Sequence, residues 1–206
     1  MPMVLFDKSE CPFCWKVRLA LSYKDISFIE KVVDTDNKSE EFLAISPTGK
    51  VPVLETGEHV LFESTLILHF LEDLQQSKPS LLPGNPASRH LARHLNHYAD
   101  TVIGPRIRDA IFTQRGKPVS EWDQEAIQRS QDNWLLCLEE LTPLLDGQRY
   151  FCGEPSFAEC ALIPRFALAE AYNLTGLKEF PALQDWFHGL KGSKVFRATA
   201  PALCLP

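Results

Sequence analysis

Membrane spans, a basic surface and a secretory signal are all missing from this 206-residue sequence. No apolar run approaches the roughly 18 to 20 residues that a membrane span needs. The first ten residues, MPMVLFDKSE, have neither the basic region nor the long apolar region of a secretory signal. Lys and Arg number 21 against 27 Asp and Glu, whereas nucleic-acid binding depends on clustered cations. We therefore expect a cytoplasmic protein that binds neither membranes nor nucleic acid.

A second close pair of cysteines is missing as well. Six cysteines occur, and Cys11 and Cys14 form the one closely spaced pair. Structural zinc normally needs four ligands, often two such pairs, so no metal site is predicted. The cytosol keeps thiols reduced, so a permanent disulfide is not expected. The pair is then either buried and inert, or reactive.

The first part of the chain alternates between strand and helix patterns. Strands are predicted at residues 3–6, 26–33, 51–55 and 59–62, and helices at 12–24, 38–45 and 64–76. The order, a βαβ unit followed by a helix, two strands and a helix, indicates a small mixed sheet covered by helices.

The rest of the chain shows helical spacing alone. Residues 77–87 hold three prolines and a glycine, which interrupt any helix and indicate a linker. Apolar residues then recur at helical spacing over 87–114, 121–145, 156–172 and 181–190. Ser156 and Glu159 have capping-box spacing at one helix start. We predict an α/β domain at 1–77, a linker at 78–87 and an all-α domain at 88–206.

The cysteine pair stands where the first helix begins. Pro12 suits the first helical position, and the free N–H groups there, with the helix dipole, favour an anion and lower a thiol pKa. Cys11 is closest to those groups and is predicted to be the nucleophile. Cys14, one turn inside, either resolves a mixed disulfide or packs in the core. Lys8 either favours the thiolate, pairs with a substrate carboxylate, or is an ordinary surface lysine.

Two motifs resemble known glutathione-dependent proteins. Residues 7–14, DKSECPFC, resemble the glutaredoxin active-site segment. Residues 46–54, SPTGKVPVL, followed by FEST at 62–65, resemble the glutathione site of cytosolic glutathione transferases. The resemblance covers essentially the whole chain and is to an omega-like or glutaredoxin-like member. It implies a thioredoxin-like N-terminal domain and an all-α C-terminal domain.

The resemblance also implies a set of glutathione contacts. Pro52 would follow a cis peptide bond and leave the backbone of Val51 to bind the cysteinyl part of glutathione. Glu63 and Ser64 would receive the γ-glutamyl carboxylate at a helix start, where the alternative is a plain helix cap. Lys38 would bind the glycine carboxylate, where the alternative is a surface lysine. Tyr98, Arg106, Arg108 and Phe112 would lie on the helix that lines the second-substrate cleft.

A cysteine at the catalytic position implies thiol-disulfide exchange, because it forms a mixed disulfide with glutathione. We expect a glutathione-dependent thiol transferase or reductase, dimeric by resemblance, that takes glutathione as co-substrate and a small electrophile or disulfide as second substrate. Omega-like members usually have Cys-Pro-Phe-Ala, so Cys14 leaves a monothiol or a dithiol cycle open. The alternatives are a non-enzymatic interaction or regulatory protein and a conventional conjugating transferase.

Overall fold

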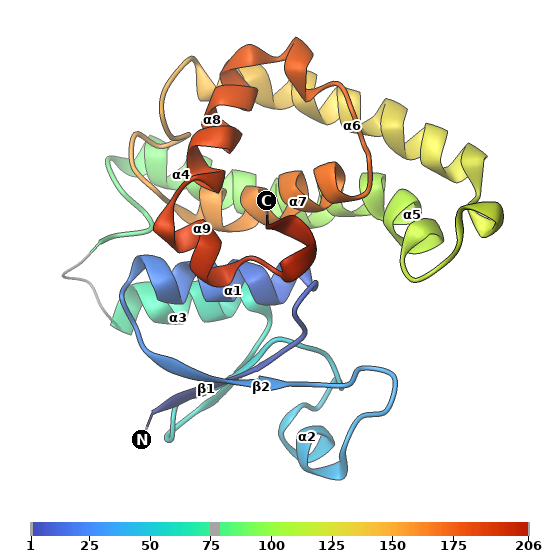
Figure 1. Ribbon diagram of the computed structural model, residues 1–206. Coiled ribbons are helices and arrows are strands. Elements are labelled where there is room, and N and C mark those ends of the chain that lie inside the picture. The colour runs from blue at the N-terminus through green and yellow to red at the C-terminus, as the bar shows by residue number, and fades with distance from the viewer. Residues whose placement is uncertain (1, 75–78, 206) are drawn as a thin grey trace.

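The computed structural model describes residues 2–74 and 79–205. Its first part contains β1 (Met3–Asp7), α1 (Pro12–Tyr23), β2 (Phe28–Val32), α2 (Glu40–Ile45), β3 (Val53–Glu55), β4 (Val60–Phe62) and α3 (Ser64–Leu74). The four strands form one sheet in the order β2-β1-β3-β4, in which β1 pairs with β2 in parallel and the other pairs are antiparallel. Helices α1 and α3 lie together on one side of this sheet (Figure 1).

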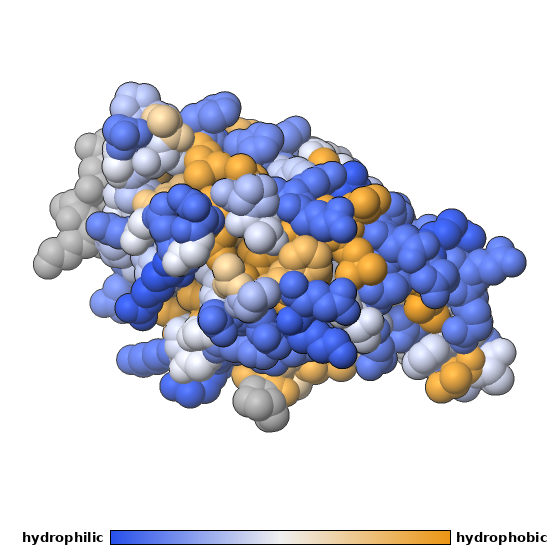
Figure 2. Space-filling model, turned by 90° about the horizontal axis from the view of Figure 1, so that it is seen from above, coloured by the Kyte–Doolittle hydropathy of each residue, from blue (hydrophilic) through white to orange (hydrophobic). Residues whose placement is uncertain are grey.

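The second part of the described chain is helical. Its main helices are α4 (Pro86–Tyr98), α5 (Gly104–Gln114), α6 (Gln124–Leu145), α7 (Phe157–Ala171), α8 (Pro181–Lys191) and α9 (Lys194–Thr199). Short 3-10 segments occur at Val119–Glu121, Leu177–Glu179 and Ala202–Cys204. Seen from above this region, hydrophobic residues interrupt a mostly hydrophilic surface near the centre of the view (Figure 2). The predicted order, an α/β part followed by an all-α part, is confirmed.

The segment predicted as one helix over 87–114 contains a π-helical turn, Ala99–Ile103, between α4 and α5. Pro105 accounts for it, because proline has no N–H to donate and its ring clashes with the carbonyl four residues earlier. Gly104 instead donates its N–H to the carbonyl of Ala99. Helix α9, six residues long, was not predicted. The predicted end of the third helix at Gln76 lies outside the described residues.

Helix α1 joins the two parts through one core. Trp15 is fully buried, its indole N–H donates to Thr199 Oγ1 at 3.0 Å, and its ring packs edge-on against Phe196. Helices α3, α7 and α9 all contact α1. On the opposite face of the sheet, Phe42 of α2 packs against Phe6. The cleft described below is therefore built on a shared core.

The predicted linker lies partly in this core. Leu81 and Leu82 are buried, and the Leu81 carbonyl accepts a hydrogen bond from the N–H of Phe157 at the start of α7. The capping box at that helix start, Ser156 with Glu159, is confirmed. The predicted boundary at residues 77 and 78 lies outside the described residues, so the division into domains stays a prediction.

None of the helices within residues 2–74 and 79–205 is both long and apolar enough to cross a membrane.

Candidate active site

Two adjoining cavities form a cleft between the α/β part and helices α4, α5 and α7. The Cys11 cavity, about 560 Å³, is lined by Cys11 and by residues of α5 and α7. The Ser64 cavity, about 410 Å³, is lined by Ser64 with Val51, Pro52 and Glu63. Phe13, Val51 and Asp100 line both cavities, so the two are neighbouring halves of one site.

Cys11 occupies the N-cap position of α1, with Pro12 as the first helical residue, as the sequence predicts. The pKa of its thiol is lowered to about 7, chiefly because the Cys14 thiol donates to its sulfur and also because the N–H groups of Cys14 and Phe13 do so. Burial and the charge of Asp7 oppose this shift. A larger fraction of Cys11 than of an ordinary cysteine is therefore thiolate at neutral pH.

Cys14 differs sharply from Cys11, although the two stand one helical turn apart. Its side chain is fully buried, and its pKa is raised, first by burial and then by its hydrogen bond to Cys11. A thiol in this position keeps its proton and donates it as a hydrogen bond. Cys14 thus supports the Cys11 thiolate and does not compete with it.

The glutathione-motif residues gather in the Ser64 cavity. The Val51–Pro52 peptide bond is cis, which confirms the expectation from the resemblance. Glu63, directly before α3, has a φ of 66°, a left-handed conformation that glutamate adopts rarely and at a cost of roughly 1 to 2 kcal/mol. Its carbonyl accepts the N–H of Ile67, which starts the helix. Such backbone outliers concentrate at ligand sites.

Of the two lysines that were predicted to act at the site, Lys8 lines a cavity and Lys38 does not. Lys38 is exposed and is not among the residues that line either cavity; its ammonium lies beside Gly49, 3.8 Å from the point where a Cβ would stand on that glycine. Lys50, in the same motif as Val51, does line the Ser64 cavity. Lys8 lines the Cys11 cavity and donates to Thr35 Oγ1 at 2.6 Å.

The four residues expected on the second-substrate helix divide into two pairs. Arg108 and Phe112 line the Cys11 cavity. Tyr98 and Arg106 instead both donate to the carboxylate of Glu140 on α6, and neither is among the residues that line the two cavities.

A buried ionic cluster lies beneath the cleft and was missed by sequence reasoning. Asp100, in the π-helical turn, pairs with Lys16 of α1 at 2.5 Å and with Arg165 of α7 at 3.4 Å. Lys16 also donates to Thr65 Oγ1 at 3.2 Å. One signal was available, because Arg165 stands alone as a charge in the apolar run of residues 160–169.

Arg18 is a further buried cation, in addition to Lys16 and Arg165, whose partners the sequence pattern did not assign. It pairs with Asp7 and donates to the carbonyl oxygens of Ser9 at 2.7 Å and Thr199 at 3.1 Å. These contacts tie the end of β1 and the segment before Cys11 to α9. Arg18 therefore holds the loop that positions the cysteine.

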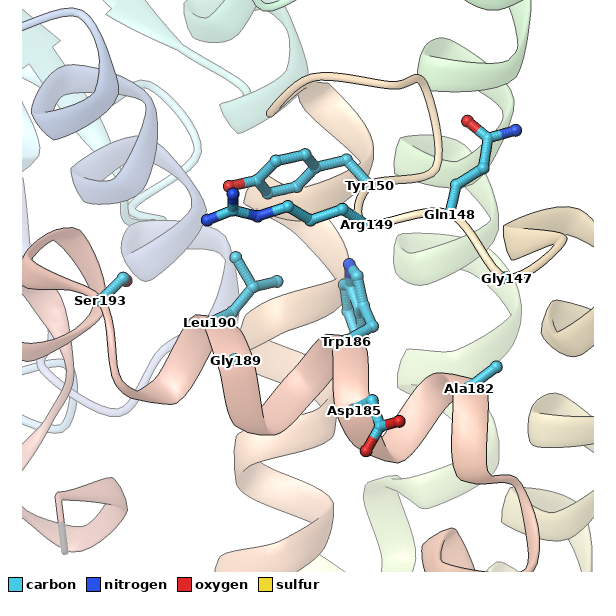
Figure 3. Close-up of a pocket in the computed structure, with 10 residues that line it drawn as sticks. All are labelled: Gly147, Gln148, Arg149, Tyr150, Ala182, Asp185, Trp186, Gly189, Leu190 and Ser193. Carbon is cyan, nitrogen blue, oxygen red and sulfur yellow. The ribbon is translucent and has the colours of Figure 1, made fainter.

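A third cavity, about 580 Å³, lies away from this cleft, between α8 and the loop of residues 147–150 (Figure 3). Arg149 extends beside the ring of Tyr150, and Trp186 rises from α8 toward the same loop. No cysteine or histidine is among the residues that line it. The cleft at Cys11, which contains the thiol with a lowered pKa, is the candidate active site. Among the described residues, no group of three or more His, Cys, Asp or Glu is placed to hold a metal ion.

Comparison with known proteins identifies the family. A family model described as Glutathione S-transferase, N-terminal domain, matches residues 10–74. Probable glutathione S-transferase parC of Nicotiana tabacum is 30% identical over 177 residues, which are 84% of this chain and 76% of that protein. The chain belongs to the glutathione S-transferase family.

Two further members show the breadth of the similarity. Probable maleylacetoacetate isomerase 1 of Drosophila melanogaster is 29% identical over 195 residues, 91% of this chain and 77% of that protein. The crystal structure of rice GST1 in complex with glutathione has a TM-score of 0.84 and 25% identity, and covers 98% of this chain and 91% of that one. The expected glutathione transferase architecture, a thioredoxin-like part followed by an all-α part, is thereby confirmed.

Proposed function

We propose that this glutathione S-transferase is a glutathione-dependent thiol transferase or reductase of the omega-like or glutaredoxin-like type. One observation carries the proposal: Cys11, a thiol with a pKa of about 7, stands in the cleft beside the cis Val51–Pro52 peptide. Thiolate is the nucleophilic form, so a thiol with this pKa is reactive at neutral pH.

Glutathione is the proposed co-substrate, held in the Ser64 cavity. The backbone of Val51, fixed by Pro52, binds the cysteinyl part, and the start of α3 at Glu63 and Ser64 receives the γ-glutamyl carboxylate. Lys38 is the predicted partner of the glycine carboxylate, and Lys50 in the cavity lining is a second cation for it. The similar rice protein, which was crystallised in complex with glutathione, supports glutathione as the co-substrate.

The proposed reaction proceeds in two exchanges. The Cys11 thiolate attacks the glutathione sulfur of a mixed disulfide, forms a bond to it and expels the other half as a thiolate, which takes a proton from water. A second glutathione thiolate then attacks the glutathione sulfur on Cys11, which frees the Cys11 thiolate and forms glutathione disulfide. Overall, the mixed disulfide and one glutathione thiol give the free substrate thiol and glutathione disulfide, so one thiol is oxidised while the substrate sulfur is reduced.

Cys14 favours a monothiol cycle. A resolving cysteine must itself attack as a thiolate, whereas Cys14 is fully buried and its pKa is raised by burial. We therefore assign Cys14 a supporting role, as the hydrogen-bond donor to Cys11.

The deciding experiment is glutathione-dependent reduction of a small mixed disulfide by wild type, Cys11→Ser and Cys14→Ser. We expect the reduction rate of Cys11→Ser to equal the uncatalysed rate, and we expect Cys14→Ser to retain catalytic turnover. Loss in both variants would indicate a dithiol cycle. No turnover by wild type would contradict the proposal and favour a binding or regulatory role, whereas conjugation that survives Cys11→Ser would indicate a conjugating transferase.

A second candidate is a glutathione-dependent isomerase, which is favoured by the relatives named maleylacetoacetate isomerase. The two candidates separate by substrate: incubation with maleylacetoacetate and glutathione, followed spectroscopically, detects isomerisation without net oxidation of glutathione.

We also propose that the protein is a cytoplasmic homodimer. Phe62 and Leu66, at the edge of the α/β part next to the Ser64 cavity, are large apolar side chains exposed by 40% and 61%. Sedimentation equilibrium tests this, and a monomer at micromolar concentration would contradict it.

A further inference from the structure

The Cys11 cavity is lined by more cationic than anionic side chains. Its lining contains Lys8, Arg108, Arg115 and Arg165 against Glu10, Asp36 and Asp100. Some of these charges already pair within the wall, since Arg115 contacts Glu10 at 3.2 Å. The question is which cations remain without a matching anion.

Arg165 is the first such cation. Its side chain is 7% exposed, and its guanidinium lies 4.8 Å from the ring centroid of Phe13. In the described chain its one ion pair is with Asp100, at 3.4 Å, and its Nε is buried without a hydrogen-bond partner. Asp100 also serves Lys16, at the shorter distance of 2.5 Å. Two buried cations thus share one carboxylate, so Lys16, Arg165 and Asp100 together carry one positive charge in excess beside the cavity. The other negative charge that acts on Arg165 is that of the Cys11 thiolate, the group that reacts.

Arg108 is the second. It is exposed, stands on α5 in the cavity lining, and its guanidinium lies 5.1 Å from the ring centroid of Phe112. Within the described residues it has no ion pair. Lys8 has none there either, but its ammonium already donates to Thr35 Oγ1 at 2.6 Å. An arginine held over an aromatic ring keeps its N–H groups free to bind a carboxylate in a bidentate manner.

We propose that the Cys11 cavity binds a carboxylate of the second substrate through Arg165 and Arg108. This inference rests on the proposed function and adds its substrate class: a small acid whose apolar body lies against Phe13, Ile111 and Phe112. Burying a cation without a counter-charge is costly, so an anionic substrate that supplies the counter-charge binds more tightly than its neutral analogue. Arg165 and Arg108 are then specificity-determining residues for the exchange at Cys11.

The first test measures charge selectivity at Cys11 without any turnover. Iodoacetate and iodoacetamide both alkylate a thiolate, which attacks the CH₂ carbon as iodide leaves with the bonding electrons, and they differ in the carboxylate. The rates are read by mass spectrometry on the Cys11 peptide, with free glutathione as reference. We expect the iodoacetate-to-iodoacetamide ratio at Cys11 to exceed that of glutathione by about tenfold or more.

Three variants assign the effect. Arg108→Gln and Arg165→Met should each lower this ratio toward that of glutathione, and Arg165→Lys should keep part of it. Arg149→Gln is the matched control. Arg149 also lies over an aromatic ring, that of Tyr150 at 5.3 Å, but in the third cavity, away from Cys11 (Figure 3). This control substitution should leave the ratio unchanged. If Arg165→Met fails to fold, Arg108→Gln still decides, because Arg108 is exposed. A wild-type ratio no higher than that of glutathione, or one that both Arg108→Gln and Arg165→Met leave unchanged, would overturn the proposal.

The second test uses turnover and separates this inference from the proposed function. The substrates are the mixed disulfides of glutathione with 3-mercaptopropionate and with its neutral amide. A kcat/KM about tenfold higher for the acid supports the inference. Equal reduction of both would overturn it and leave the thiol transferase function standing. If neither is reduced while the alkylation preference for iodoacetate holds, the proposed function fails and the carboxylate site remains.

Discussion

At the scale of single residues, the site depends on a division of roles between two cysteines in one helical turn. Cys11 accepts hydrogen bonds at the start of α1, and Cys14 donates one from the core. The first therefore has a lowered pKa and the second a raised one. The pKa values of two identical side chains differ because the Cys11 thiolate accepts hydrogen bonds from the Cys14 thiol and from N–H groups at the helix start, whereas burial dominates at Cys14.

Removal of the Cys14 donor should raise the pKa of Cys11. Cys11 is an acid with a lowered pKa, so its thiolate prevails above pH 7 and is lost below it. In Cys14→Ala we expect the midpoint of its alkylation against pH to move up by about one unit, and the rate at pH 7 to fall roughly fivefold. Cys152→Ala, which alters a thiol away from the cleft, is the control. An unchanged midpoint in Cys14→Ala would contradict the assigned role.

At the scale of elements, the π-helical turn and Gly104 place two parts of the ionic cluster. The turn carries Asp100, and Gly104, which follows it, lies against the guanidinium of Arg165. A Cβ at Gly104 would stand 3.0 Å from Cζ and Nη1 of Arg165, so a larger residue there displaces the arginine. Glycine is needed here for close approach and not for an unusual φ.

Replacement of two helical glycines by alanine should change the free energy of unfolding in opposite directions. Gly189 in α8 has no atom within 4 Å of a built Cβ, so Gly189→Ala should raise the free energy of unfolding by roughly 0.5 to 1 kcal/mol. Gly104→Ala has the same gain in helix propensity, but we expect it to be destabilising because Arg165 must move. Urea denaturation at constant m-value measures both changes. An equal gain at the two positions would show that Arg165 yields freely.

At the scale of the whole molecule, Asp100 connects the two parts of the chain. Its partners Lys16 and Arg165 come from α1 and α7, and the side chains of both are buried. A buried ion cluster contributes little net stability while all its members are present. Removal of the shared carboxylate, however, leaves the charges of Lys16 and Arg165 buried without compensation. Asp100 and Arg165 also line the Cys11 cavity, so the fold and the proposed substrate specificity depend on the same residues.

Asp100→Ala should therefore lower the free energy of unfolding by about 3 to 5 kcal/mol, as measured by tryptophan fluorescence in urea. The control is Glu41→Ala, which breaks the exposed pair between Lys31 and Glu41 at 3.3 Å and should cost less than about 1 kcal/mol. Similar losses in the two variants would mean that the Asp100 cluster is solvated and carries no special weight.

Much of the fold, and the part of the site around Cys11 and Val51, could be predicted from local sequence patterns. The strands, the cysteine at the start of α1, the Ser156 capping box and the cis Val51–Pro52 bond all depend on residues close together in the chain or on a recognisable motif. Helix boundaries were predicted less well where one residue changed the hydrogen bonding, as Pro105 does.

The sequence by itself determined the family resemblance, the order of elements and the position of Cys11 at the start of α1, because helix starts, periodicity and short motifs are local. Only the tertiary structure decided that Lys16, Asp100 and Arg165 meet, since Asp100 lies 84 positions from Lys16 and 65 positions from Arg165 in the sequence. A polar residue in an apolar helix does not indicate its partner; chain packing does. The anionic preference proposed for the cleft belongs to that second kind of information.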